Sequence, residues 1–120
     1  MEDIANWEQA HGEIPLGSVV MARTGRTQNA MAIPGYSEDA AKFLVEGRNA
    51  LGLGIDVASL DHHPSKDSPV RRYILAHSVY QLENVANLDR APATGGLVVV
   101  APTKLENGSG GPVRILALVQ

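Results

Sequence analysis

Continuous apolar runs constrain the fold of this chain more than any other feature. The clearest are LGLGIDV at residues 51–57, LVVVA at 97–101 and VRILALV at 113–119. A strand buried on both faces has such an uninterrupted pattern, whereas a strand with one wet face alternates. We therefore predict an α/β fold, a mixed β-sheet with flanking helices. Further strands are expected over residues 18–23 and 79–83, and helices over residues 2–10, from residue 37 onward and over 69–77.

Local signals mark where two of these helices begin. Ser37 can accept a hydrogen bond from a backbone N–H of the first turn, and Glu38 and Asp39 favour the positive end of the helix dipole. Ser68 followed by Pro69 is a typical pair for the N-cap and the first helical position. Both segments are therefore predicted to start helices that pack on the sheet.

Length and composition are those of one modest domain. The chain has 120 residues, of which 44% are apolar and 19% charged, which is typical of a globular chain rather than a disordered one. It has one Trp, three Tyr and one Phe, so the core must be mainly aliphatic. We expect a single domain over residues 1–120.

Charge and composition argue against several kinds of partner. The formal net charge is −3 and Arg71-Arg72 is the only adjacent basic pair, so no nucleic acid is expected. Cysteine is absent, which excludes disulfides and thiol chemistry. The apolar runs are too short to cross a bilayer, and Glu2 and Asp3 stand where a signal peptide would be positive. We expect no membrane partner and a cytoplasmic location.

Polar residues follow the first apolar run. Asp56, Ser59 and Asp61 come at the end of that predicted strand, and strand ends are where α/β proteins place ligand-binding groups. The same residue types also bond nearby backbone in turns. Ligand binding and turn formation therefore both remain open for these three residues.

Other short motifs give weaker evidence of function. Gly52 and Gly54 lack the third glycine of a dinucleotide fingerprint and suggest close approach by another backbone. The adjacent His62 and His63 point apart in an extended chain, which favours a surface loop over a shared metal. A G-x-S-x-G elbow is absent from the sequence, so serine hydrolase chemistry receives little weight.

Five segments together resemble one known family in their order and spacing. They are EDIANWEQAHGEIPLGSVVMARTG (2–25), PGYSEDAAKFL (34–44), GLGIDVASLD (52–61), VYQLENVANLD (79–89) and GGLVVVAPTKLENGSGGPVRILALV (95–119). These segments are similar to the C-terminal half of the cyclase family, the kynurenine formamidase-like metal-dependent hydrolases. The resemblance implies a partial version of the family's mixed-sheet domain. It also implies an ancestry among enzymes that use zinc or manganese to open cyclic or linear amides and lactones.

The resemblance also bears on the metal ligands. The family's H-x-G-T-H-x-D motif belongs to the half that this chain does not resemble, and the motif is absent from the sequence. The C-terminal half supplies a His and, twelve residues later, a Glu. Glu83 holds the Glu position, whereas Arg71 stands where the family has His. An aromatic residue of the family is replaced by Arg26. The resemblance therefore implies no cofactor here, with zinc or manganese expected only if the family activity is retained.

Arg71 lacks a lone pair for a metal, but it can pair with a carboxylate. We predict that Arg71 and Glu83 are side-chain neighbours, with Arg71 pointing to solvent as the alternative. The former family pocket is predicted to comprise Arg71, Glu83, Asp56, Ser59 and Asp61 as binding residues, none of them catalytic.

Two functions fit these observations. The first is a truncated cyclase-like domain without hydrolase activity of its own, acting as an oligomeric module that binds a small molecule or a protein. The alternative is a metal-dependent amide or lactone hydrolase that a second chain completes. A partial domain leaves strand edges uncovered, so a homo-oligomer is expected, with seams near Leu97 or Val113.

Overall fold

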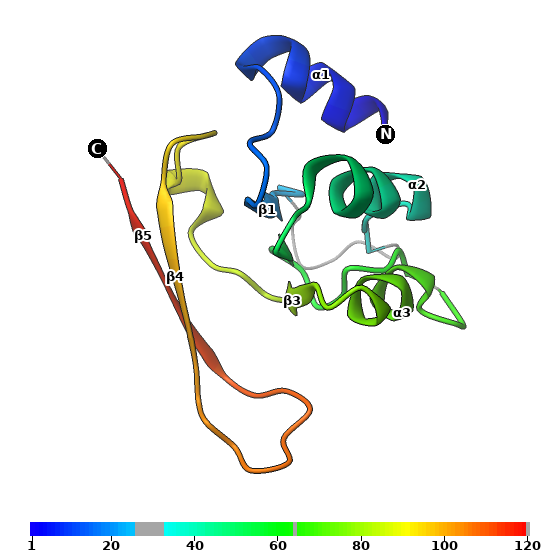
Figure 1. Ribbon diagram of the computed structural model, residues 1–120, viewed down its shortest axis with the longest axis vertical. Helices are drawn as coiled ribbons and strands as arrows, with labels where there is room; N and C mark the ends of the chain where they lie inside the picture. Colours follow the sequence, from blue (N-terminus) through cyan, green and yellow to red (C-terminus); the bar gives the residue numbers. More distant parts are fainter. Residues whose placement is uncertain (26–32, 64, 120) are drawn as a thin grey trace. The chain divides into compact units, whose positions relative to one another are not determined.

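A computed structural model describes residues 1–25, 33–63 and 65–119. The chain forms two compact units, Met1–Asp89 and Arg90–Gln120, which are described separately (Figure 1). Helices and small sheets occur together, which confirms the α/β class. The single domain over residues 1–120 stays a prediction. No helix in these ranges is long and apolar enough to span a membrane.

The predicted helices and strands occur close to their expected positions. The first unit contains α1 (Glu2–His11), β1 (Val19–Ala22), α2 (Glu38–Lys42), the π-helix η1 (Phe43–Gly47), β2 (Gly52–Ile55), α3 (Pro69–Ala76) and β3 (Tyr80–Leu82). The short 3-10 helix η2 (Leu88–Arg90) follows, and the second unit contains β4 (Leu97–Pro102) and β5 (Val113–Leu118).

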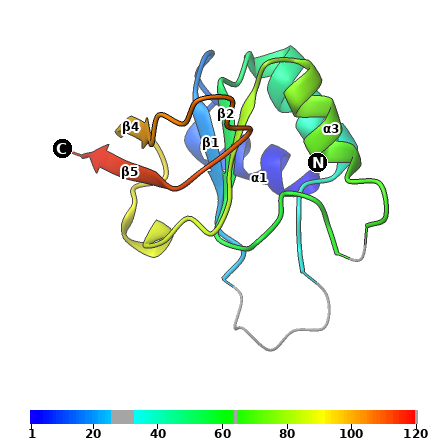
Figure 2. The same cartoon turned by 90° about the horizontal axis from the view of Figure 1, so that it is seen from below.

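Three parallel strands form the sheet of the first unit, in the order β1-β2-β3. All four residues of the central strand β2 are buried, as its uninterrupted apolar run predicts. Helices α2 and α3 contact each other and lie on the same side of this sheet (Figure 2). The carboxyl ends of the three strands therefore share one edge, where polar loop residues can converge.

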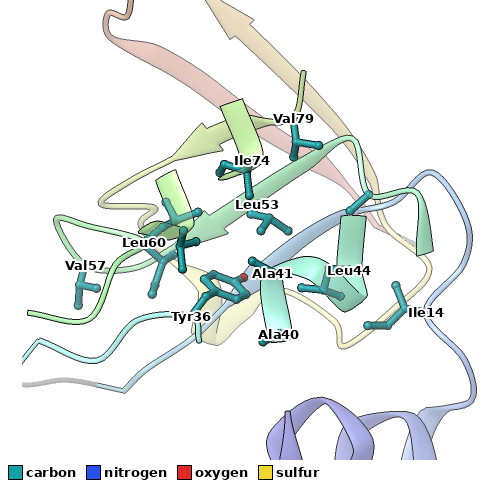
Figure 3. Close-up of a cluster of buried hydrophobic side chains, with 13 residues drawn as sticks. Ile14, Tyr36, Ala40, Ala41, Leu44, Leu53, Val57, Leu60, Ile74 and Val79 are labelled. Carbon is teal, nitrogen blue, oxygen red and sulfur yellow. The ribbon is translucent and has the colours of Figure 1, made fainter. Parts of the chain in front are cut away.

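The core lies between the sheet and these helices. Leu53 projects from β2 toward Leu44 of η1 and Ile74 of α3, and all three are fully buried (Figure 3). The Tyr36 ring also packs in this cluster, and its hydroxyl donates to the carbonyl oxygen of Gly54 at 2.9 Å. The core is thus aliphatic around one anchored tyrosine.

The strand glycines are approached by side chains, not by another backbone as expected. A Cβ on Gly52 would run into the ring of Tyr80 on β3. A Cβ on Gly54 would lie 3.0 Å from Cγ of Met21 on β1. Each glycine therefore makes room for the side chain of a flanking strand.

Both predicted helix starts are confirmed, with Ser37 and Ser68 at the N-cap positions of α2 and α3, but only Ser37 bonds its helix through its side chain. The Ser37 hydroxyl accepts from the backbone N–H of Ala40 at 3.2 Å, so it caps α2. Ser68 has a left-handed backbone, with φ 43°, and its side chain makes no cap bond to α3. A residue distant in sequence caps α3 instead.

The second unit is an antiparallel hairpin. β4 pairs with β5 over six residues each, from Leu97 opposite Leu118 to Pro102 opposite Val113. Neither strand has a buried residue. This sheet therefore has two strands and solvent-accessible side chains on both faces.

Candidate functional site

Arg71 and Glu83 meet at the end of the parallel sheet. Arg71 is the third residue of α3, and Glu83 directly follows β3. The Arg71 guanidinium donates from Nη2 to Oε1 of Glu83 at 2.8 Å. The two side chains are 40% and 24% exposed, so the ion pair is partly screened by water. The predicted contact is confirmed, while a binding role for the pair stays a prediction.

Asp61 caps α3 and thereby positions Arg71. Its carboxyl oxygens accept from the backbone N–H groups of Val70 at 2.8 Å and of Arg71 at 3.2 Å. Asp61 is 3% exposed, and these bonds supply partners for amides that the first helical turn leaves unpaired. The Ser59 hydroxyl accepts from the Asp61 backbone N–H at 3.1 Å. Ser59 and Asp61 therefore organise a turn and a helix start.

Asp56 holds the loop that follows β1. Its Oδ1 accepts from the Thr24 hydroxyl at 2.8 Å, and Oδ2 accepts from the Gly25 backbone N–H at 3.3 Å. The Thr24 backbone N–H lies 3.0 Å from both oxygens. Burial raises the pKa of this carboxyl, but the bonds from Thr24 and Gly25 outweigh it and hold the pKa below its ordinary value.

Two shallow hollows lie beside these aspartates. The first, of about 210 Å³, is lined by Arg23, Gly25, Asp56, Val85, Asn87, Leu88 and Asp89. The second, of about 270 Å³, is lined by Tyr36, Ser37, Glu38, Asp61, His62, Ser65, Pro69 and Val70. Asp56 and Asp61 line different hollows, and neither hollow is lined by Arg71 or Glu83. The five predicted pocket residues are therefore divided among three places.

A self-contained metal site does not fit the residues that the structure describes. Within residues 1–25, 33–63 and 65–119, no three or more His, Cys, Asp or Glu side chains gather to hold a metal ion. Glu83 already accepts from Arg71, which offers a metal no lone pair. His62 and His63 are both exposed in their loop, as expected for a surface pair.

Some side-chain contacts between residues distant in the sequence could not be predicted from the sequence. Thr24 has no local signal that marks it as the partner of Asp56, because 32 residues separate the two. Asp61 lies nine residues before Val70, beyond the reach of a local capping pattern. Arg26, which stands where the family has an aromatic residue, lies outside the described residues.

Similarity to known proteins assigns the chain to a family. Residues 1–62, more than half of the chain, match the family model Cyclase, described as "Putative cyclase". The chain belongs to the cyclase family. Isatin hydrolase from Roseibium aggregatum is 33% identical over 133 aligned positions that cover 97% of this chain and 50% of that protein. Kynurenine formamidase from Polaromonas naphthalenivorans is 31% identical over an alignment that covers 89% of this chain and 48% of that protein.

Solved structures of cyclase-family proteins share the fold. Isatin hydrolase A from Ralstonia solanacearum superimposes with a TM-score of 0.88 at 30% identity, covering 100% of this chain and 52% of that one. Isatin hydrolase A from Labrenzia aggregata gives 0.84 at 36% identity, covering 97% and 51%. The chain thus spans about half the length of the curated relatives it matches, which confirms a partial cyclase-family domain.

Proposed function

We propose that this cyclase-family domain has no metal-dependent hydrolase activity of its own and acts as an oligomeric module that binds a small molecule or a protein. The observation that carries the proposal is the 2.8 Å contact between the Arg71 guanidinium and the Glu83 carboxylate. In the family, by resemblance, these two positions supply metal ligands. Here one of them supplies a permanent cation instead.

The ion pair opposes metal binding in two ways. Arg71 stays protonated, so it cannot donate an electron pair to a metal. Its positive charge also lies next to the one retained ligand position, where it would repel a dication. Glu83 finds its counter-charge within the protein, in the Arg71 guanidinium 2.8 Å away, so it needs no bound cation as a partner.

Metal content tests this proposal. The purified chain should retain less than about a tenth of an equivalent of zinc or manganese after incubation and buffer exchange, because a protein site needs three or four ligands. Elemental analysis of the wild type, Glu83→Ala and the exposed control Glu106→Ala makes the measurement. About one equivalent in the wild type and in Glu106→Ala, lost in Glu83→Ala, would overturn the proposal.

A second candidate is a metal-dependent amide or lactone hydrolase that another chain completes. Two observations favour it: the relatives include isatin hydrolase and kynurenine formamidase, and this chain spans about half their length. Another chain would have to bring the zinc or manganese ligands that this one lacks. Isatin hydrolysis should then be absent with this chain and Mn²⁺ alone and appear on addition of the partner chain. No activity in the mixture would reject this candidate.

A further inference from the structure

The loop that joins β4 to β5 carries the only asparagine-glycine step of the sequence. Six asparagines occur in the chain, and only Asn107 is followed by glycine. Residues 103–112 are all exposed, and they form the orange loop between the two strands (Figure 1). The Thr103 backbone N–H donates to the carbonyl oxygen of Pro112 at 3.2 Å. The loop is therefore closed at its base and open to water along its length.

An asparagine-glycine step can react with itself. The backbone nitrogen of Gly108 attacks Cγ of Asn107, and the side-chain amide nitrogen takes up the displaced proton and leaves as ammonia. The product is a five-membered succinimide ring. Water then opens this ring at one of its two carbonyl carbons and gives either aspartate or isoaspartate. Glycine favours the attack, because it has no Cβ beside the nucleophile and its backbone rotates freely.

The backbone around Asn107 is held only within the loop. Asn107 has a left-handed conformation, with φ 57°, which asparagine adopts more readily than most residues. The Gly108 N–H donates to the carbonyl oxygen of Leu105 at 3.2 Å, at the long end of the usual range. Leu105 is itself 53% exposed. A small local motion therefore frees the attacking nitrogen without disturbing either strand.

Two other left-handed asparagines lack this freedom. Asn49 and Asn84 have φ of 49° and 54°, so their backbones resemble that of Asn107. The N–H groups that follow them donate to the carbonyl oxygens of Leu44 and Ile55, each at 3.0 Å, and both acceptor residues are buried in the core. Attack at these positions requires a core hydrogen bond to open first. The fold thus separates Asn107 from asparagines of similar conformation.

We propose that Asn107 is a deamidation site, at which the folded chain converts to aspartate and isoaspartate with water as the only co-reactant. The inference goes beyond the proposed function and does not depend on it. Residues 90–120 hold 3 basic and 1 acidic residue, a net +2, and the new carboxylate beside Glu106 lowers this to +1. Isoaspartate also adds one methylene to the loop backbone. No residue of the loop is buried, so the loop can absorb this change.

Mass spectrometry on the full chain tests the inference. Incubation at body temperature and mildly alkaline pH should raise the mass by one dalton, because OH replaces NH2, and peptide mapping should place the change at Asn107. The rate there should exceed the rates at Asn49 and Asn84 by at least about tenfold, since those need local opening of the core. The isoaspartate product should accept methyl groups from an isoaspartyl methyltransferase used as a reagent. Mildly acidic pH should slow the reaction, because the attacking nitrogen must lose its proton.

Two variants serve as matched controls. Asn107→Gln keeps the amide but would have to form a six-membered ring, so the mass gain should disappear. Gly108→Ala adds a Cβ beside the nucleophile, 2.8 Å from Cβ of Leu105, and should slow the reaction by at least about tenfold. Circular dichroism before incubation checks that each variant folds. An unchanged wild-type mass, a gain that persists in Asn107→Gln, or equal rates at Asn49, Asn84 and Asn107 would each overturn the inference.

Discussion

At the residue scale, Arg71 and Glu83 should be energetically coupled. Their side chains are 40% and 24% exposed, which is intermediate between a screened surface pair and a buried one. We expect a coupling of about 1 kcal/mol in a double-mutant cycle of Arg71→Ala and Glu83→Ala, measured by urea unfolding. Purely additive destabilisation would show that the 2.8 Å contact has no energetic weight.

Substitutions of Asp61 and Ser68 test which of these two side chains stabilises the start of α3. Asp61→Ala should lower the free energy of unfolding by about 2 kcal/mol, because it leaves the buried Val70 N–H without its partner. Ser68→Ala should change it by less than about 0.5 kcal/mol, since the Ser68 side chain makes no cap bond. A larger effect of Ser68→Ala would restore the capping role that the sequence predicts.

Asp56 should make the stability of the first unit depend on pH. Its pKa in the folded protein lies below the ordinary value of 3.8. The ionised carboxylate therefore contributes stability above pH 3.8, and this contribution is lost as the pH falls through the folded pKa. Asp56→Asn should cost about 1 kcal/mol at pH 7 and less at pH 3, by urea unfolding. Equal costs at both pH values would contradict this prediction.

At the scale of elements, two glycines permit close packing of chain segments, but at different cost. A Cβ on Gly35 would lie 2.5 Å from the backbone carbonyl carbon of Asp61 and the nitrogen of His62, which cannot move independently. Gly35→Ala should therefore destabilise the protein by about 2–3 kcal/mol. Gly52→Ala should cost about 1 kcal/mol, because the colliding Tyr80 is 39% exposed and can turn away.

Repeating both glycine substitutions in a Tyr80→Ala background tests the cause of this difference in cost. Gly52→Ala should become nearly neutral there, because the ring that its Cβ meets is gone, whereas Gly35→Ala should keep its full cost. Thermal unfolding of Tyr80→Ala, and of each glycine variant with and without it, provides the comparison. Equal costs of Gly52→Ala with and without the ring would mean that strand geometry, not the tyrosine, requires glycine at this position.

At the scale of the whole molecule, self-association would make stability depend on concentration. A folded dimer that unfolds to monomers gains about 1.4 kcal/mol for each tenfold rise in protein concentration. The melting temperature of the wild type should therefore rise between micromolar and hundreds of micromolar protein if the domain is the oligomer proposed above. A wild-type melting temperature that is independent of concentration would argue against the dimer.

The order of the α-helices and strands could be predicted from the sequence, because their signals are local, whereas the π-helix η1 and the 3-10 helix η2 were not predicted. The apolar run in β2 and the Ser37 cap depend on residues a few positions apart, and both are confirmed. Family membership could also be predicted, since the five quoted segments extend over most of the chain. The pairing of Arg71 with Glu83 followed from that resemblance, not from any local pattern.

The roles of the aspartates were decided only by tertiary structure. Asp56 and Asp61 had both ligand-binding and turn-forming interpretations in the sequence, and the fold engages them with backbone amides 32 and nine residues away. Such partners depend on how strands and loops meet in space, and no periodicity encodes that. The sequence by itself determined the helices, the strands and the family. Three-dimensional packing decided which carboxylates hold the scaffold and which one meets a cation, because those contacts form only when distant segments are brought together.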